Sequence, residues 1–258
     1  MKKYCAISYI FNGAEPVREP LVVDSNCDYY LFTDDRQLTS KTWKIVYMER
    51  IAKTDFPGYK KAYLIKNGFH YYIPNIQDYE YFVVVDSSIL IKDSLNPIID
   101  FMENRKYDVS VAPHPWRDNF MDEYDAWVYW RHLDPKWKDN FIKMTENTRM
   151  PGNGLIETTF KVLKNNKEVL ELLDDVHNTL FYSCNFDDNV EQIWFSHVLS
   201  RHLGKLRINY LNQQIYINSD YMLKFAHGST VDSNEKQFSP RGGIYIQVFR
   251  AFCQDNRQ

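Results

Sequence analysis

The chain has 258 residues, of which 44% are hydrophobic and 25% charged, and its formal net charge is −3. No Pro, Gly or Ser tract and no charge block divides it, so we expect a single domain over residues 1–258. The slight excess of acid argues against a nucleic-acid partner, because binding to the phosphate backbone requires concentrated Lys and Arg.

Cysteine usage and hydropathy bear on the compartment. The four cysteines are scattered and include no C-x-x-C pair: Cys5, Cys27, Cys184 and Cys253. A chain of this length can fold without disulfides, so we expect free thiols in a reducing compartment. No stretch approaches the roughly 20 apolar residues that span a bilayer. We therefore expect a cytoplasmic protein, at most peripheral at the inner face of the cell membrane.

The first third of the chain alternates strand and helix patterns. Strands are predicted at residues 3–11, 28–33 and 43–48, which are rich in Tyr, Ile and Val. Residues 59–72 follow Pro57 and Gly58 and place apolar residues at helical spacing, which predicts a helix. Alternation of this kind is typical of a parallel sheet.

The rest of the chain continues in the same way. Helices are predicted at 95–104, within 118–143, at 167–180 and after Asp187 or Asp188, which would cap the last of them. Strands are predicted at 81–85, 108–112, 155–163, 206–210 and 214–217. The expected fold class is α/β with a central mixed sheet.

The run 81–91, YFVVVDSSILI, is apolar except for its centre, where Asp86 follows the strand. A lone carboxylate at the end of a buried strand lies at the edge of the sheet where open α/β sheets bind ligands. We expect Asp86 to face an open cleft there. The alternative is that Asp86 only caps the turn after the strand.

Several short motifs occur in a defined order: TDD at 33–35, VVVDSS at 83–88, HPWRD at 114–118, GLIET at 154–158, DNVEQIWFSHVL at 188–199 and HG at 227–228. With them, residues 4–228 resemble a bacterial member of the glycosyltransferase-like domain family that includes plant mucilage hexosyltransferases. More distantly they resemble the GT-A enzymes of glycosyltransferase family 8. The resemblance implies the GT-A fold, a Rossmann-like nucleotide-diphospho-sugar transferase fold.

The resemblance also implies a metal site. Asp86-Ser87-Ser88 is similar to a D-x-D motif, so Asp86 and Ser88 would bind Mn²⁺ or Mg²⁺ at the donor's diphosphate, with His227 as a further ligand. Ser88 stands where the family often has a carboxylate or an amide, and it is a weaker, neutral ligand. For His227 the alternative is an ordinary loop residue.

Four further residues are assigned to the donor by the same resemblance. Lys61 and Lys66, on the predicted helix before the Asp86 strand, would reach the phosphates. Thr33 and Asp34, at the end of the second strand, would bind the base and ribose, with UDP favoured. The alternatives are lysines on an exposed helix face and a polar turn without a ligand.

The loop after the strand at 108–112 would lie on the acceptor side. His114, Trp116, Arg117 and the later Glu123 are assigned to substrate binding, as is Asn153 in the break before the next strand. Trp116 would stack on a sugar and Arg117 would pair with an acidic group. The alternative is a salt bridge from Arg117 to Glu123 or Asp118 that holds the loop.

Two carboxylates are candidates for catalysis. Hexosyl transfer needs a base for the acceptor hydroxyl or a polar group that supports an oxocarbenium-like transition state. Asp188 begins a helix whose next turn carries the substrate-binding Gln192, and Glu157 sits early in a strand. For Asp188 the alternative is the helix N-cap.

These residues predict a glycosyltransferase, and more closely a hexosyltransferase, that moves a hexose from a nucleoside-diphosphate sugar to a glycan or lipid-linked acceptor in surface polysaccharide synthesis. Two alternatives remain open on the same fold. One is a carbohydrate-binding or scaffold protein without activity. The other is a sugar nucleotidyltransferase, which lacks a Gly-rich phosphate loop near the N-terminus here.

Overall fold

The structure is a computed structural model that describes residues 3–114, 117–131, 138–145, 155–183, 190–212 and 214–225. Within these residues the strands are β1 (Tyr4–Ile10), β2 (Cys27–Thr33), β3 (Lys44–Tyr47), β4 (Tyr81–Val85), β5 (Ile89–Ile91), β6 (Val109–Pro113), β7 (Ile156–Lys164), β8 (Ile208–Tyr210) and β9 (Met222–Lys224). The helices are α1 (Glu49–Ala52), α2 (Gly58–Gly68), α3 (Asn96–Arg105), α4 (Phe120–Arg131), α5 (Lys138–Thr145), α6 (Lys167–Asn178), α7 (Glu191–Arg201) and α8 (Gln214–Ile217). Short 3₁₀ turns lie at Phe69–Tyr71 and Ile76–Asp78, and a π-turn lies at Thr179–Ser183.

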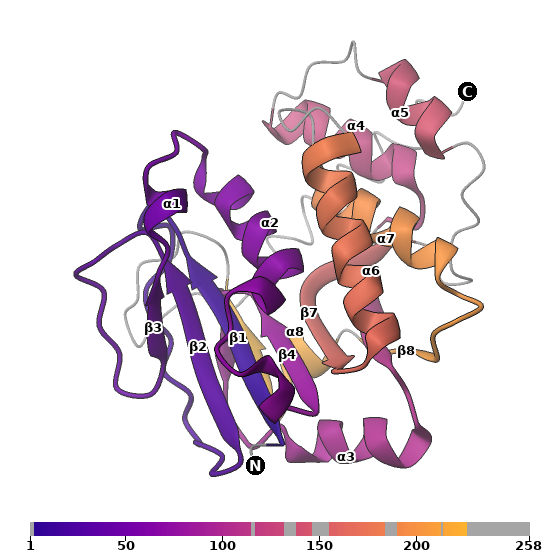
Figure 1. The fold of residues 1–258 in the computed structure, drawn as a ribbon. Helices are drawn as coiled ribbons and strands as arrows, with labels where there is room; N and C mark the ends of the chain where they lie inside the picture. The colour runs from indigo at the N-terminus through magenta and orange to yellow at the C-terminus, as the bar shows by residue number, and fades with distance from the viewer. Residues whose placement is uncertain are drawn as a thin grey trace.

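Seven strands of the described chain form one mixed sheet in the order β3-β2-β1-β4-β7-β6-β8 (Figure 1). β1, β2, β3 and β4 are parallel, whereas β7 runs antiparallel to both β4 and β6. β5 and β9 pair separately as a two-stranded antiparallel sheet. The predicted α/β class with a central mixed sheet is confirmed.

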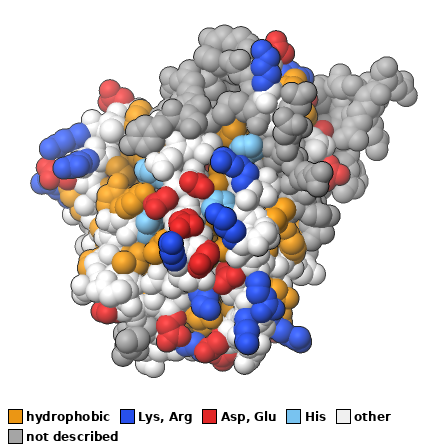
Figure 2. Space-filling model, turned by 45° about the vertical axis from the view of Figure 1, so that its right-hand side comes forward, with side chains coloured by type: hydrophobic (Ala, Val, Ile, Leu, Met, Phe, Trp, Pro, Cys, Tyr) orange, Lys and Arg blue, Asp and Glu red, His pale blue; other side chains and the backbone are white. Residues whose placement is uncertain are grey.

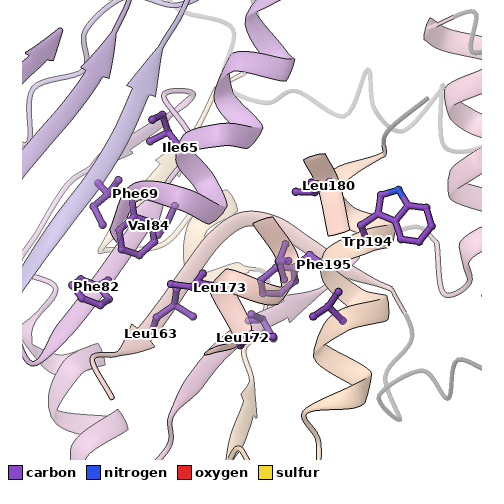
Figure 3. Close-up of a cluster of buried hydrophobic side chains, with 14 of the residues drawn as sticks. Ile65, Phe69, Phe82, Val84, Leu163, Leu172, Leu173, Leu180, Trp194 and Phe195 are labelled. Atoms are coloured by element: carbon purple, nitrogen blue, oxygen red, sulfur yellow. The ribbon is translucent and has the colours of Figure 1, made fainter. Parts of the chain in front are cut away.

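Hydrophobic side chains cover both faces of the sheet, which is why β4 has no polar residue. Phe82 and Val84 of β4 point to one face, where they pack with side chains of α2, α6 and α7 (Figure 3). Tyr81, Val83 and Val85 point to the other face and pack with α3 and α8. The alternation of side chains along a strand therefore serves two cores, as in other buried parallel strands.

Local sequence determines where several helices begin and end. Pro57 precedes α2, and Pro97 occupies the first turn of α3, where a missing N–H costs nothing. Asn166 caps α6 by accepting a hydrogen bond from the Val169 N–H at 2.9 Å. Lys106 ends α3 in the left-handed conformation, with φ of 56°. Among the described helices, none combines the length and the apolar character that crossing a membrane requires.

Two predictions about elements are wrong, and the strand β9 has no predicted counterpart. Residues 214–217 form the single helical turn α8, although Ile-Tyr-Ile favours a strand by propensity. Helix α7 begins at Glu191 with Val190 at its N-cap position, so neither Asp187 nor Asp188 caps it.

The strand order reverses direction next to β1. β2 and β3 lie on one side of β1 and β4 lies on the other, so the chain crosses over through α2 on its way from β3 to β4. Open α/β sheets bind ligands beyond the carboxyl ends of the strands at such a switch point. In this protein that point lies between the ends of β1 and β4.

Candidate functional site

The predicted polar residues meet at one edge of the sheet. Asp34, Asp86 and His114 follow the carboxyl ends of β2, β4 and β6, which are parallel to one another. Glu157 is the second residue of β7, which runs the opposite way and so begins at this edge. The topology thus gathers four residues that are far apart in sequence.

Asp86 is the residue at the switch point, and it is buried rather than open to solvent. Its side chain is only 11% exposed, and Oδ1 lies 2.9 Å from Nζ of Lys66 on α2. Its backbone N–H donates to the Thr159 carbonyl, and its own carbonyl accepts from Ile89 N–H in the turn that follows. The expected open cleft in front of Asp86 is therefore occupied by a lysine.

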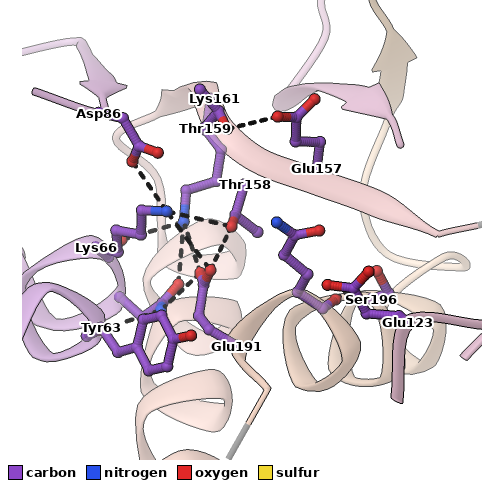
Figure 4. Close-up of polar contacts among 12 residues, drawn as sticks. Tyr63, Lys66, Asp86, Glu123, Glu157, Thr158, Thr159, Lys161, Glu191 and Ser196 are labelled. Atoms are coloured by element: carbon purple, nitrogen blue, oxygen red, sulfur yellow. Dashed lines mark hydrogen bonds and ion pairs between the residues drawn. The ribbon is translucent and has the colours of Figure 1, made fainter. Parts of the chain in front are cut away.

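Asp86 belongs to a group of six buried charged residues that we call the ionic cluster: Lys66, Lys161, Lys224, Asp86, Glu157 and Glu191. Figure 4 labels all of them except Lys224. Its members come from α2, β7, β9, α7 and the turn after β4. Three lysines oppose three carboxylates, so the cluster is neutral when all six are ionised. Burial of so many charges requires close pairing, because an unpaired charge in the interior is strongly destabilising.

Glu191 links two of the lysines. Its carboxylate lies 3.7 Å from Lys66 Nζ and 4.0 Å from Lys161 Nζ, and it accepts hydrogen bonds from Asn67 Nδ2 at 3.1 Å and from the Thr158 hydroxyl. Burial alone would raise the pKa of Glu191, but the two lysines and these donors lower it overall. Glu191 is therefore held as an anion at the base of the cluster.

Lys161 anchors the cluster to the end of α2. Its Nζ donates to Asn67 Oδ1 at 3.0 Å and to the Lys66 carbonyl at 3.2 Å, and the side chain is fully buried. Burial lowers the pKa of Lys161 to about 8, although Glu191 acts in the opposite direction. A register shift of β7 against β6 between Ala112 and Val111 accompanies this arrangement.

Glu157 is tied down by three partners. Lys224 Nζ lies 2.6 Å from its Oε1, Thr159 Oγ1 donates to the same oxygen at 2.7 Å, and the Tyr216 hydroxyl donates to Oε2. Burial would raise the pKa of Glu157, but Lys224, His114 and the hydrogen bonds lower it to about 2. A general base works best with a pKa near the operating pH. The geometry therefore suits Glu157 better to the role of a permanent anion than to the predicted role of catalytic base.

The low pKa of Glu157 makes a prediction about acid stability. Because the folded pKa of about 2 lies below the usual value of 4.5, ionised Glu157 stabilises the fold above pH 4.5 and loses this effect as the pH falls through 2. We expect urea unfolding midpoints to fall less steeply between these two values in Glu157→Gln than in the wild type. Glu171→Gln, which changes a carboxylate that is 44% exposed on α6, should follow the wild type; equal slopes in all three proteins would contradict the assignment.

The Asp86–Lys66 pair differs from the other pairs in the cluster. Burial raises the pKa of Asp86 well above its usual value, and burial also lowers the pKa of Lys66. Both shifts oppose ionisation, whereas the lowered pKa values of Glu157 and Glu191 favour it. Among the three carboxylates of the cluster, Asp86 is therefore the one whose negative charge is stabilised least.

Lys61 and Asp34 form a second pair at the ends of β1 and β2. Lys61 Nζ lies 2.7 Å from Asp34 Oδ2 and donates to Asn12 Oδ1 at 2.9 Å, while Asn12 N–H donates to Asp34 Oδ1. Gly58 permits this approach, since a Cβ there would come within 2.9 Å of the Phe11 carbonyl oxygen. Lys61 and Lys66 are both buried, so the alternative of lysines on an exposed helix face is wrong. Thr33 is also buried, and its hydroxyl accepts from the Asp35 N–H.

His114, Arg117 and Glu123 form a compact group after β6. Arg117 Nε pairs with Glu123 Oε2, its Nη2 lies 2.8 Å from His114 Nε2, and Trp127 Nε1 donates to Glu123 at 2.9 Å. Burial, together with the Arg117 charge, lowers the pKa of His114 to about 3, so the imidazole is neutral. The salt bridge between Arg117 and Glu123, considered as an alternative for this loop, is confirmed.

Four buried polar atoms around the switch point have no hydrogen-bond partner in the described part of the chain. They are Asp86 Oδ1, which meets Lys66 Nζ as an ion pair only, Tyr9 Oη at the end of β1, Ser88 Oγ in the turn after Asp86, and Gln192 Oε1 in the first turn of α7. The Tyr9 ring lies 5.7 Å from Lys66 Nζ. Buried polar atoms are nearly always paired with protein, water or a ligand, so these unpaired atoms have hydrogen-bonding capacity to offer to a ligand.

The described donors do not fit a divalent metal ion. Asp86 already pairs with a lysine, Ser88 contributes a neutral hydroxyl, and no three His, Cys, Asp or Glu side chains of the described residues converge on one point. Mn²⁺ and Mg²⁺ take oxygen ligands, and a protein site for either ion needs at least one carboxylate that is not already neutralised by a lysine. The remaining predicted ligand, His227, lies outside the described residues, as do Trp116, Asn153 and Asp188.

Four residues of the site were missed in the sequence: Tyr9, Lys161, Glu191 and Lys224. Lys161 carries a signal in retrospect, because it interrupts the apolar strand pattern FKVL at a position that the register buries. Lys224 depends on the pairing of β9 with β5, which local sequence does not reveal.

The face drawn in Figure 2 has acidic and basic side chains interspersed, with no large patch of one sign. This distribution agrees with the small net charge of the chain.

No protein-family model matches the chain, and no curated protein sequence matches it either. Solved structures with a similar fold include mouse xyloside xylosyltransferase 1 in its apo form, with 10% identity, a TM-score of 0.45, and coverage of 83% of this chain and 86% of that one. Core-mannan synthase A from Aspergillus fumigatus in its Mn/GDP form has 11% identity, a TM-score of 0.41, and coverage of 82% and 73%. Galactosyltransferase LgtC in complex with donor and acceptor sugar analogues has 8% identity, a TM-score of 0.47, and 94% coverage of both chains. At these TM-scores, function has to be argued from the residues of this chain.

Proposed function

We propose that the protein is a glycosyltransferase that takes a hexose from a nucleoside-diphosphate sugar, with UDP as the favoured nucleotide. The observation that carries this proposal is the place of the Asp86–Lys66 pair, buried at the switch point between β1 and β4. Ligands with phosphate groups bind at such points in open α/β sheets. The unpaired hydroxyls of Tyr9 and Ser88 lie at the same strand ends and can donate to phosphate oxygens.

The positive charge of Lys66 supports a diphosphate as the group that is bound. When the bond between sugar and diphosphate breaks, negative charge develops on the leaving oxygen, and a preorganised positive group stabilises it. Lys66 is such a group, since α2 and its contacts to Asp86 and Glu191 fix its position. Asp34 and Thr33, at the end of the neighbouring strand β2, are suited to bind the nucleoside.

In this proposal the acceptor is a glycan or a lipid-linked sugar, and the pathway is surface polysaccharide synthesis. The protein acts in the cytoplasm, peripherally at the inner face of the cell membrane. The loop held by His114, Arg117 and Glu123 would form the acceptor side, together with Trp116 and Asn153. Asp188 and Gln192 would face the donor sugar.

A donor screen tests the proposed activity. Purified protein is incubated with UDP-, GDP- and CMP-sugars, and release of the nucleotide is measured. We expect release from a UDP-hexose above the rate of spontaneous hydrolysis, because Lys66 and the unpaired hydroxyls stabilise the leaving diphosphate. Absence of release from every donor, with and without added glycan acceptors, would contradict the proposal.

A carbohydrate-binding protein without activity is the second candidate, and the pairing within the ionic cluster favours it. Each carboxylate of the cluster is engaged by a lysine, and the low pKa of Glu157 makes it a poor base. Binding of a nucleoside diphosphate, seen as a rise in melting temperature, would favour the enzyme. Binding of sugars alone would favour the second candidate.

A further inference from the structure

The position of Lys66 bears on how the leaving diphosphate is neutralised, and this inference rests on the proposed function. Lys66 Nζ lies 2.9 Å from Asp86 Oδ1, 3.4 Å from Thr158 Oγ1 and 3.7 Å from Glu191 Oε2. Oxygen atoms of three residues thus surround the ammonium group. A divalent ion bound to either oxygen of Asp86 would lie close to this ammonium group and would be repelled by its positive charge.

The other carboxylates of the cluster are also engaged by lysines. Lys224 Nζ lies 2.6 Å from Glu157 Oε1, and Glu191 faces both Lys66 and Lys161. In the part of the chain that is described, no acidic group at this edge is left over for a second ligand to the same ion. The donor set matches a bound ammonium group better than it matches Mn²⁺ or Mg²⁺.

Lys66 also has the capacity to bind an anion. Its ammonium group has three N–H donors, but only the contact to Asp86 is short, and those to Thr158 and Glu191 are long. The buried hydroxyls of Tyr9 and Ser88 have no partner among the described residues. Three donors from this chain can therefore receive phosphate oxygens at the switch point.

We propose that Lys66 takes the place of a divalent metal ion, so that binding and departure of the diphosphate need no metal. In the transfer step the bond between sugar C1 and the diphosphate oxygen breaks, and its electron pair leaves on that oxygen beside Lys66. The acceptor oxygen bonds to C1, and the acceptor proton passes to the released diphosphate or to solvent. Asp86 positions Lys66 and does not ligate an ion.

Calorimetric titration of the full chain with UDP, in buffer with EDTA and in buffer with MnCl₂, tests the proposal. We expect affinities that agree within about threefold in the two buffers. Lys66→Met should weaken binding in EDTA by about tenfold or more, because a charge-assisted contact is lost, and Lys66→Arg should retain most of the affinity. Lys92→Met is the matched control, since Lys92 Nζ donates to the Ser219 carbonyl and Lys92 is not a member of the ionic cluster.

A titration with Mn²⁺ alone, followed by the electron paramagnetic resonance signal of the free ion, provides a second readout. We expect no binding at submillimolar concentrations. UDP binding that occurs only with MnCl₂, or Mn²⁺ binding that Asp86→Asn abolishes, would overturn the role of Lys66 and leave the proposed function in place. Failure of UDP, GDP and CDP to bind in either buffer would overturn the proposed function and this inference with it.

Discussion

Asp86→Asn is expected to lower the rate of nucleotide release from the donor on the order of 100-fold. Asn has the shape of Asp but no charge, so it no longer pairs with the Lys66 ammonium group, whose Nζ lies 2.9 Å from Asp86 Oδ1, and no longer fixes that group beside the leaving oxygen. Steady-state release of the nucleotide, compared with the wild type at saturating donor, measures the effect. Circular dichroism and thermal unfolding check that the fold is retained.

Asp100→Asn is the matched control for this substitution. Asp100 lies on α3 with its side chain 55% exposed, and it pairs with Lys3 at the surface. Its replacement should leave nucleotide release unchanged. If Asp86→Asn also releases the nucleotide at the wild-type rate, the switch point is not the donor site, and the transferase proposal loses its main support.

Glu191→Gln is expected to lower the free energy of unfolding by about 3 kcal/mol. The substitution keeps the shape of the side chain but removes the anion that faces Lys66 and Lys161 in the interior. Two buried lysines are then left with less opposing charge, which is a much larger penalty than the loss of one neutral hydrogen bond. Urea unfolding followed by tryptophan fluorescence gives the free energies.

An exposed ion pair offers the comparison for Glu191. Glu171 and Lys167 pair at 3.6 Å on the surface of α6, where the side chains are 44% and 82% exposed. Surface pairs contribute about 0–1 kcal/mol, so Glu171→Gln should change the unfolding free energy very little. Similar losses in the two variants would mean that the ionic cluster does not stabilise the fold.

Much of the architecture is predictable from the sequence because β4 and its neighbours are continuous apolar runs between polar turns. Asp86 is the clearest case, since a single carboxylate in YFVVVDSSILI has to lie at the end of the strand. The same reasoning placed Asp34 and His114 at strand ends. These positions depend on local pattern and on the rule that parallel strands share a carboxyl edge.

The parts that could not be predicted depend on contacts between distant segments. Lysine within a strand pattern is normally a sign of a solvent face, whereas Lys161 is buried because Asn67 and Glu191 meet it from two helices. The propensity of Ile-Tyr-Ile predicts a strand at residues 214–217, but propensity is a weak guide over four residues, and they form α8. The occupation of the expected cleft by Lys66 follows from the orientation of α2, which periodicity does not define.

The pairing of β9 with β5 has a consequence for the order of events during synthesis on the ribosome. Glu157 leaves the ribosome long before Lys224, its nearest cation, because 67 positions separate them. Domains fold as the chain emerges, starting from the amino-terminal side, so the early strands can associate while this carboxylate still faces water. The interior of the nascent protein therefore closes only when β9 adds to β5 and delivers the last lysine.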